Sequence, residues 1–300
     1  MYIGLDIGSV SVNAVLVDDE KRILEEHYVR THGQPIETPR SVLEDMLSRT
    51  PLEKIKGLAL TGSGGKLLAR IIGALFVNEI VAQTKATSFL HPEVRTVIEI
   101  GGEDSKLILL ERGEAGGESR VADFSMNTIC AAGTGSFLDQ QASRLGLTIE
   151  EFGELALKSK KPPRIAGRCS VFAKTDMIHL QQEAAPDYDI VAGLCHAMAR
   201  NFKANIGKGK EFVKPVAFQG GVAANKGMVR GFEDILDLKP GELIIPKHFA
   251  SMGAIGAVLA ALESGQESPL IGLEPIEEYL KLAKWRLNPI RPLKARNIPW

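Results

Sequence analysis

Short apolar runs separated by glycine turns dominate the first third of the chain. Runs at 3–7 and 12–17 are rich in β-branched residues and flank Gly8-Ser9-Val10-Ser11, which predicts an N-terminal hairpin. The segments that follow alternate between predicted strands and predicted helices: 23–29, 39–47, 55–61 and 67–73. Such alternation favours an α/β fold over an all-β fold.

A second hairpin is predicted over 96–110, and its turn repeats the pattern of the first. Asp6-Ile7-Gly8-Ser9-Val10-Ser11 and Glu99-Ile100-Gly101-Gly102-Glu103-Asp104 each place a carboxylate before Ile-Gly, a small residue and the start of another strand. Two duplicated lobes explain this repeat, although so short a match also arises by chance. The rest of the chain predicts helices at 131–145, 148–158, 170–182, 188–206, 223–235 and 251–262, with strands at 213–219 and 242–245.

The composition changes from Ser264 onward, where prolines become frequent and the chain ends in a basic stretch. One amphipathic helix is predicted in this region, over 274–287. We interpret 263–300 as a C-terminal extension. The body divides into a first lobe, 1–95 completed by the helix 250–262, and a second lobe, 96–249.

Charge and apolar content exclude several classes of protein. The chain has 36 Lys and Arg against 37 Asp and Glu, and only 6% of its residues are aromatic. This nearly neutral charge and low aromatic content argue against a nucleic-acid-binding surface. The longest apolar runs, such as 253–262, reach about ten residues, whereas a membrane-spanning helix needs roughly 20. The first residues have no positively charged region and no cleavage site, so we expect no signal peptide and a cytoplasmic location.

Three predicted strands end in glycine turns, at Gly8, Gly101-Gly102 and Gly220-Gly221. Successive backbone N–H groups in such turns form a nest for an anion. Asp6 and Glu99 would repel a phosphate unless Mg²⁺ lies between them, usually through waters. We therefore expect two facing turns that hold a polyphosphate and a third that seats a nucleoside. The alternative is that the glycines only satisfy turns with positive φ. The chain has no P-loop and no dinucleotide-binding fingerprint.

The three cysteines, an odd number, argue against a disulfide framework. Cys130 and Cys169 each lie at the start of a predicted helix, where the helix dipole favours a thiolate. Cys195 lies inside a predicted helix and is expected to be a small buried apolar residue. Separate buried thiols are the simplest interpretation of the first two. The alternative is that two chains together supply the four thiolates of one [4Fe–4S] cluster.

Four motifs identify a family that the sequence resembles over about residues 1–262. They are 130–139 (CAAGTGSFLD), 169–173 (CSVFA), 220–227 (GGVAANKG) and 250–257 (ASMGAIGA). The sequence resembles the ATPases that activate 2-hydroxyacyl-CoA dehydratases and the related ATP-binding subunits of benzoyl-CoA reductase. These belong to the superfamily of acetate and sugar kinases, Hsp70 and actin. The resemblance implies an α/β fold of two ribonuclease-H-like lobes, with ATP or ADP bound in the cleft between them.

The resemblance also implies roles for individual residues. The first phosphate motif is then Asp6, Gly8, Ser9 and Ser11, and the second is Glu99, Gly101, Gly102 and Asp104. Gly220 and Gly221 form the nucleoside motif, and Gly133, Thr134 and Gly135 border the nucleotide. Asp6, Glu99 and Asp104 are the candidate catalytic residues, with Asp6 holding Mg²⁺ through water. The family commonly has Asp-Ile-Gly-Gly-Gln-Asp at the second turn, so Glu99 and Glu103 put water positioning for hydrolysis in question.

Two subunits of a homodimer would jointly hold one [4Fe–4S] cluster through Cys130 and Cys169. The function implied is that of a reductive activase. It hydrolyses ATP, accepts an electron from reduced ferredoxin or flavodoxin, and passes the electron to a partner iron–sulfur dehydratase or reductase. Two alternatives are a small-molecule kinase of the same superfamily, such as an amino-sugar kinase, and a non-catalytic nucleotide-dependent scaffold. Neither alternative requires paired cysteines at helix starts.

Overall fold

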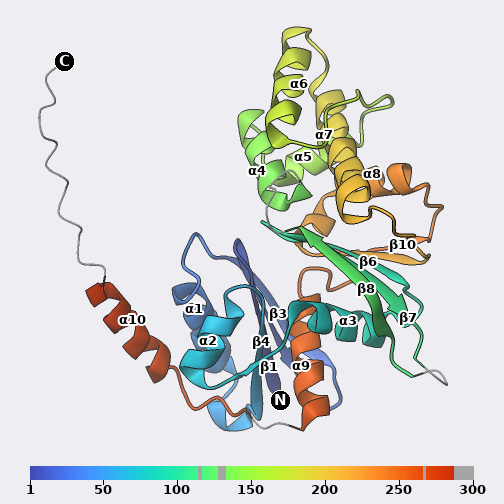
Figure 1. The fold of residues 1–300 in the computed structure, drawn as a ribbon. Helices are drawn as coiled ribbons and strands as arrows, with labels where there is room; N and C mark the ends of the chain where they lie inside the picture. The colour runs from blue at the N-terminus through green and yellow to red at the C-terminus, as the bar shows by residue number, and fades with distance from the viewer. Residues whose placement is uncertain (114–116, 128–132, 266–267, 287–300) are drawn as a thin grey trace, which may run out of the picture.

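Two five-stranded sheets with the same strand order form the framework of the protein (Figure 1). The computed structural model describes residues 1–113, 117–127, 133–265 and 268–286, with side chains up to residue 282. The first sheet has the order β3-β2-β1-β4-β5. Its strands are β1 (Tyr2–Ile7), β2 (Ser11–Val17), β3 (Ile23–Arg30), β4 (Gly57–Thr61) and β5 (Leu75–Phe76).

The second sheet, read from its opposite edge, has the order β8-β7-β6-β9-β10. Its strands are β6 (Thr96–Ile100), β7 (Ser105–Glu111), β8 (Arg120–Asn127), β9 (Val216–Gln219) and β10 (Leu243–Ile244). In both sheets the first three strands are antiparallel, and the fourth and fifth run parallel to the first. The two predicted hairpins are therefore confirmed, and the shared topology is the duplication that the repeated turn predicted.

Helices cover the first sheet on both sides. They are α1 (Glu37–Arg49), α2 (Gly65–Ile72), α9 (Met252–Ser264) and the one-turn η1 (Leu52–Lys54). α9 packs against β1 and β4, so a segment late in the sequence completes the first lobe. The helix α10 (Glu274–Arg286) is anchored by Ile276, which is fully buried in the core beneath β1 and α2. No helix in the described ranges is long and apolar enough to cross a membrane.

The second lobe carries a helical layer on its sheet. Its helices are α4 (Gly135–Arg144), α5 (Ile149–Ala156), α6 (Ser170–Gln182), α7 (Asp187–Asn201) and α8 (Lys226–Leu236), with the shorter turns η4 (Phe202–Ile206) and η5 (Gly221–Ala224). Phe202, Phe218 and Phe232 are fully buried and pack edge to face, with ring centroids 4.9 and 5.5 Å apart. The predicted start of α5 is confirmed, because Thr148 and Glu151 form a capping box.

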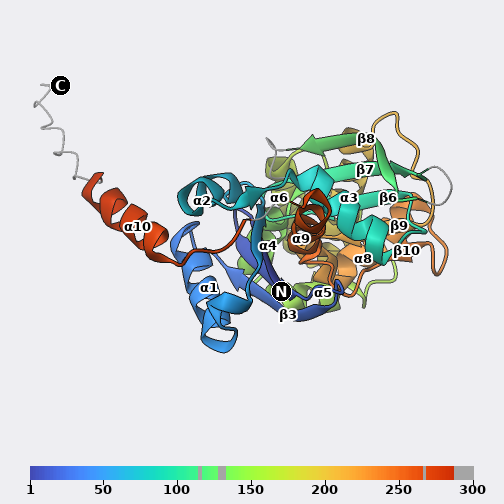
Figure 2. The same cartoon turned by 90° about the horizontal axis from the view of Figure 1, so that it is seen from below.

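One helix that the sequence pattern did not predict, α3 (Glu79–Leu90), lies where the two lobes meet (Figures 1 and 2). It packs closely against α9 of the first lobe and is followed directly by β6 of the second sheet. The edge strand β8 was also missed, and α4 begins at Gly135, later than the predicted start at 131. The chain passes between the lobes twice among the described residues, from α3 to β6 and from β10 to α9.

Candidate functional site

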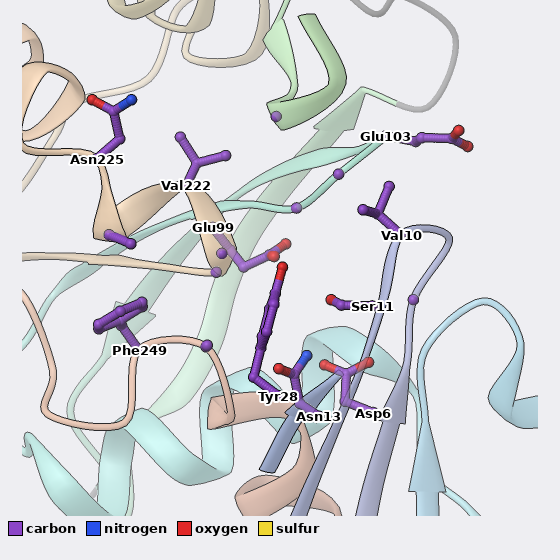
Figure 3. A pocket seen from close by; sticks show the side chains of 18 of the residues that line it. Asp6, Val10, Ser11, Asn13, Tyr28, Glu99, Glu103, Val222, Asn225 and Phe249 are labelled. Atoms are coloured by element: carbon purple, nitrogen blue, oxygen red, sulfur yellow. The ribbon is translucent and has the colours of Figure 1, made fainter. Parts of the chain in front are cut away.

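A cavity of about 760 Å³ lies between the two lobes, at the ends of both sheets (Figure 3). A volume of roughly 300–1,000 Å³ is typical of small-molecule sites. Most of the residues that the sequence singled out line it: Asp6, Gly8, Ser9, Ser11, Glu99, Gly101, Gly102, Asp104, Gly135, Gly220 and Gly221. The structure thus gathers three glycine turns that are far apart in the sequence at one cleft.

The two hairpin turns have the same local geometry and contact each other. The Gly8 N–H donates to the Ser11 carbonyl at 2.9 Å, and the Gly101 N–H donates to the Asp104 carbonyl at 3.0 Å. A Cβ added at Gly102 would overlap the side chain of Val10, so the turn tips leave no room for a larger residue there. The start of α4 is fixed to the second turn, because the Gly135 N–H donates to the Gly101 carbonyl at 2.9 Å.

Asp6, which is partly buried, and Glu99, which is buried, lie at the ends of the two central strands, and each packs against a glycine with positive φ. A Cβ at Gly62 (φ 88°) would lie 2.5 Å from Asp6 Oδ1, and a Cβ at Gly220 (φ 87°) would lie 2.8 Å from Glu99 Oε1. Burial, followed by the nearby Glu79 and Glu99 carboxylates, raises the pKa of Asp6 to about 8. Burial also raises the pKa of Glu99 to about 7, against the opposing effect of Lys106.

Lys106 is a buried ammonium at this end of the cavity, and the sequence analysis did not identify it. Its Nζ lies 2.8 Å from Glu99, 2.7 Å from Asp104 and 2.9 Å from Glu79, and its side chain is 3% exposed. Burial alone would lower the pKa of Lys106, but the three carboxylates raise it above its ordinary value. The ammonium therefore stays charged and compensates part of the negative charge of Glu79, Glu99 and Asp104.

The face of β3 that looks into the cavity carries residues of the first lobe that reach the second. Arg30 pairs with Asp139 of α4 at 3.2 Å, and Glu26 pairs with His248 at 2.6 Å. Between them the Tyr28 side chain extends from β3 towards Glu99 (Figure 3). These contacts hold the lobes together along one side of the cleft.

Unpartnered polar atoms mark both ends of the cavity. Asn13 Oδ1 is buried without a hydrogen-bond partner on β2, beside Asp6, and Asn225 Nδ2 is buried without one at the start of α8. Val222 adds apolar surface near Asn225 (Figure 3), and Phe249 lies at Gly220, whose N–H donates to the Phe249 carbonyl at 2.8 Å. Because a buried polar atom without a partner is costly, these two amides favour a polar ligand or water in the cavity.

Cys169 and Cys195 do not line this cavity. Cys169 is partly exposed and is the N-cap residue of α6, next to the exposed side chains of Val171 and Phe172. Cys195 is fully buried, and burial raises the pKa of its thiol to about 12, which confirms its predicted role as an apolar core residue. Cys130 lies outside the described residues.

Two of the residues expected beside the nucleotide lie behind the cavity wall. Gly133 and Thr134 are buried, and the Ser105 hydroxyl donates to the Gly133 carbonyl, so they support the second turn from beneath. No group of three or more His, Cys, Asp or Glu side chains in the described part of the chain is arranged to hold a metal ion.

Each lobe has a five-stranded mixed sheet with helices, and the cavity lies between the lobes at equivalent turns. This confirms the predicted class: a two-lobed α/β protein of the actin, Hsp70 and sugar-kinase type. The ethanolamine utilization protein EutJ from Carboxydothermus hydrogenoformans shares the fold, with a TM-score of 0.55 at 16% identity over 86% of this chain and 88% of that one.

The chain belongs to the BadF/BadG/BcrA/BcrD ATPase family, whose model matches residues 3–261. It is 32% identical to the 2-hydroxyisocaproyl-CoA dehydratase activator of Clostridioides difficile, over 89% of this chain and 97% of the relative. A structure of that activator with bound ADPNP has a TM-score of 0.78 and covers 94% of this chain and 97% of that one, at 30% identity. Component A of the Acidaminococcus fermentans (R)-2-hydroxyglutaryl-CoA dehydratase has a TM-score of 0.77 at 31% identity, over 88% of this chain and 98% of that one.

Proposed function

We propose that this protein is an ATP-hydrolysing reductive activase. Two copies share one [4Fe–4S] cluster and pass a low-potential electron to a partner iron–sulfur dehydratase or related reductase. Reduced ferredoxin or flavodoxin supplies the electron. The observation that carries the proposal is the pair of equivalent turns that face each other across the cleft, with Asp6 and Glu99 behind them. A relative with the same architecture was solved with ADPNP bound.

The cavity has the features that an ATP site requires. Backbone N–H groups of the two glycine turns suit the phosphates, and the unpartnered Asn13 and Asn225 amides offer polar contacts at the two ends. Asp6 would hold hydrated Mg²⁺ through water, near Glu99 or Asp104, and the ion would neutralise phosphate charge. Gly220 and Gly221, beside Val222 and Phe249, form the nucleoside end.

The position of Cys169 supports a shared cluster. Its thiol lies at the surface at the start of α6, where the N–H groups of the first helical turn favour a thiolate. Val171 and Phe172, each 64% exposed, present apolar surface beside it, which suits coverage by a second copy. Cys130 supplies the other thiolate of each chain, and a [4Fe–4S] cluster held in this way accepts and donates one electron at a time.

The proposal is tested by iron content and visible absorbance of protein purified without oxygen. We expect brown protein with about four irons per two chains, since a [4Fe–4S] cluster has four thiolate ligands. Cys130→Ser and Cys169→Ser should each lose both iron and colour. Cys195→Ala is the matched control, because it removes a thiol that is buried in the core, and it should keep both.

Iron-free protein that still binds ATP after reconstitution would contradict the electron-transfer function. In that case phosphorylation of an amino sugar or another small molecule would identify the kinase alternative. Sedimentation that shows ATP-dependent assembly of iron-free protein would identify the non-catalytic scaffold alternative.

A further inference from the structure

Glu79, Gln83 and Thr87 form a polar stripe on α3 that faces the second lobe. They are spaced four residues apart and therefore lie on one side of the helix. Glu79 pairs with Lys106 of β7 at 2.9 Å. Gln83 accepts a hydrogen bond from Gln219 at the end of β9 at 2.6 Å, and Thr87 donates to Gln219 at 3.3 Å. The whole stripe is thus bonded to strand ends of the second sheet.

The adjoining side of α3 packs against the first lobe. Ala82 and Ala86 are fully buried, and α9 packs against this side at close range. Neighbouring Gly253 of α9 leaves room for the Asp6 carboxylate and the Gln83 amide, so α3, α9 and the end of β1 meet at one point. α3 is therefore clamped between the two lobes, and any change in the angle between them must alter one of its two sides.

We propose that Lys106 and Glu79 act as a positioning pair that couples the phosphate end of the cleft to α3. The inference deepens the proposed function, because it names residues through which the nucleotide site acts on the lobes. Lys106 holds Glu99 and Asp104 in place with one ammonium and fixes the first turn of α3 with the same group. It touches carboxylates of three separate elements: β6, the second hairpin turn and α3.

The geometry explains why this pair transmits a change at the cleft. Lys106 is 3% exposed, so solvent cannot replace a lost partner. A polyphosphate or cation that draws Glu99 or Asp104 towards the cavity changes the positions that Nζ can occupy. Because Glu79 is bound to the same nitrogen, the first turn of α3 shifts with it. Removing one partner of a buried ion pair also leaves the remaining charges uncompensated.

Four variants separate positioning from a merely structural role. Glu79→Gln keeps Lys106 with Glu99 and Asp104 but weakens its link to α3, whereas Lys106→Met removes the centre of the cluster and Lys106→Arg keeps its charge. Lys214→Met, which breaks a 2.6 Å ion pair with Glu242 far from the cavity, is the matched control. The readouts are nucleotide affinity, kcat for ATP hydrolysis, and amide hydrogen exchange of residues 82–84 with and without ADP.

In the wild type and in Lys214→Met, ADP should slow exchange at residues 82–84. In Glu79→Gln this slowing should be lost and kcat should fall about tenfold. ADP affinity should change less than about threefold. A loss of kcat with little loss of affinity indicates that a group is misplaced, not that a binding contact is missing. Lys106→Arg should retain more of the slowing than Lys106→Met. If Lys106→Met does not fold, Glu79→Gln alone carries the test.

The inference is overturned if ADP slows amide exchange at residues 82–84 in Glu79→Gln as much as in the wild type and kcat is unchanged. A wild-type protein that binds ADP but hydrolyses no ATP would instead contradict the proposed function. The exchange measurement would still test the coupling in that case, because it requires only bound ADP.

Discussion

Asp6 and Glu99 occupy equivalent positions in the two lobes. In the sheet register Asp6 lies opposite Thr61 and Glu99 lies opposite Gln219, and the next residue after each partner is a glycine with positive φ. Each carboxylate lies at the end of a central strand, Glu99 buried and Asp6 partly buried, and both line the same cavity. The duplication has therefore placed one carboxylate of each lobe at the same cavity.

The buried Asp6 carboxyl should make the nucleotide-free protein less stable as pH rises. The folded pKa is about 8 against an ordinary 3.8, so between these values the folded protein keeps a proton that the unfolded chain has released. Unfolding is then favoured as pH increases across that window. Asp6→Asn removes this dependence. The stability of Asp6→Asn relative to the wild type should grow from about pH 5 to pH 8 and level off above it.

Urea unfolding in a chelator, without nucleotide, measures this difference. Asp19→Asn is the control, because Asp19 is exposed and its pKa is lowered by a hydrogen bond from Lys56. Its difference from the wild type should stay constant over the same range. If the free energies of unfolding of Asp6→Asn and the wild type change in parallel with pH, Asp6 does not keep its proton in the folded protein.

Gly62→Ala and Gly73→Ala separate backbone strain from crowding of the site. Both glycines have positive φ, 88° and 70°, so this strain costs each alanine about 1–2 kcal/mol of stability, and at Gly62 the overlap with the Ile7 carbonyl at 2.5 Å adds to it. Only at Gly62 does the added Cβ meet Asp6. We expect Gly62→Ala to lose at least about tenfold in nucleotide affinity, since small displacements at a site have large effects. Gly73→Ala should bind nucleotide like the wild type in calorimetric titrations, and equal affinities in the two variants would refute the crowding argument.

Arg30→Gln should speed nucleotide release by opening one side of the cleft. The Arg30–Asp139 pair joins β3 to α4 across the lobes at 3.2 Å and is partly exposed. An exposed ion pair contributes at most about 1 kcal/mol, so the rate should rise by up to about fivefold, and less at high salt. Arg22→Gln breaks a pair with Asp18 inside one lobe and should leave the rate unchanged. Stopped-flow displacement of a fluorescent nucleotide measures both, and identical rates would exclude a role for the cross-lobe pair.

The glycine turns could be predicted because their signal is local. Asp6-Ile7-Gly8 and Glu99-Ile100-Gly101 each contain an apolar strand end, a carboxylate and a glycine within a few residues, and the structure confirms both hairpins. The start of α5 was likewise predictable, since its capping box involves only neighbouring residues.

α3, Glu79 and Lys106 could not be found in this way. Two adjoining sides of α3 are covered, one by α9 and the other by strand ends of the second sheet, so polar Gln83 and Thr87 are buried like Ala82, whereas apolar Val81 and Phe89 are exposed. A helix in this position lacks the apolar and polar faces that reveal an amphipathic helix. Lys106 follows the second turn and resembles an ordinary strand lysine. Its burial depends on Glu79, which the fold brings to it from another element.

Nucleotide bound between the lobes should change the surroundings of a cluster held by Cys130 and Cys169. The rate at which an iron chelator removes iron from anaerobic protein measures this, with bound ADP and with bound ADPNP. We expect clearly different rates in the two states, because lobe closure would alter the exposure of the cluster. Glu79→Gln should bring the two rates together. Equal rates in the wild type, with iron present and both nucleotides bound, would show that the nucleotide does not act on the cluster.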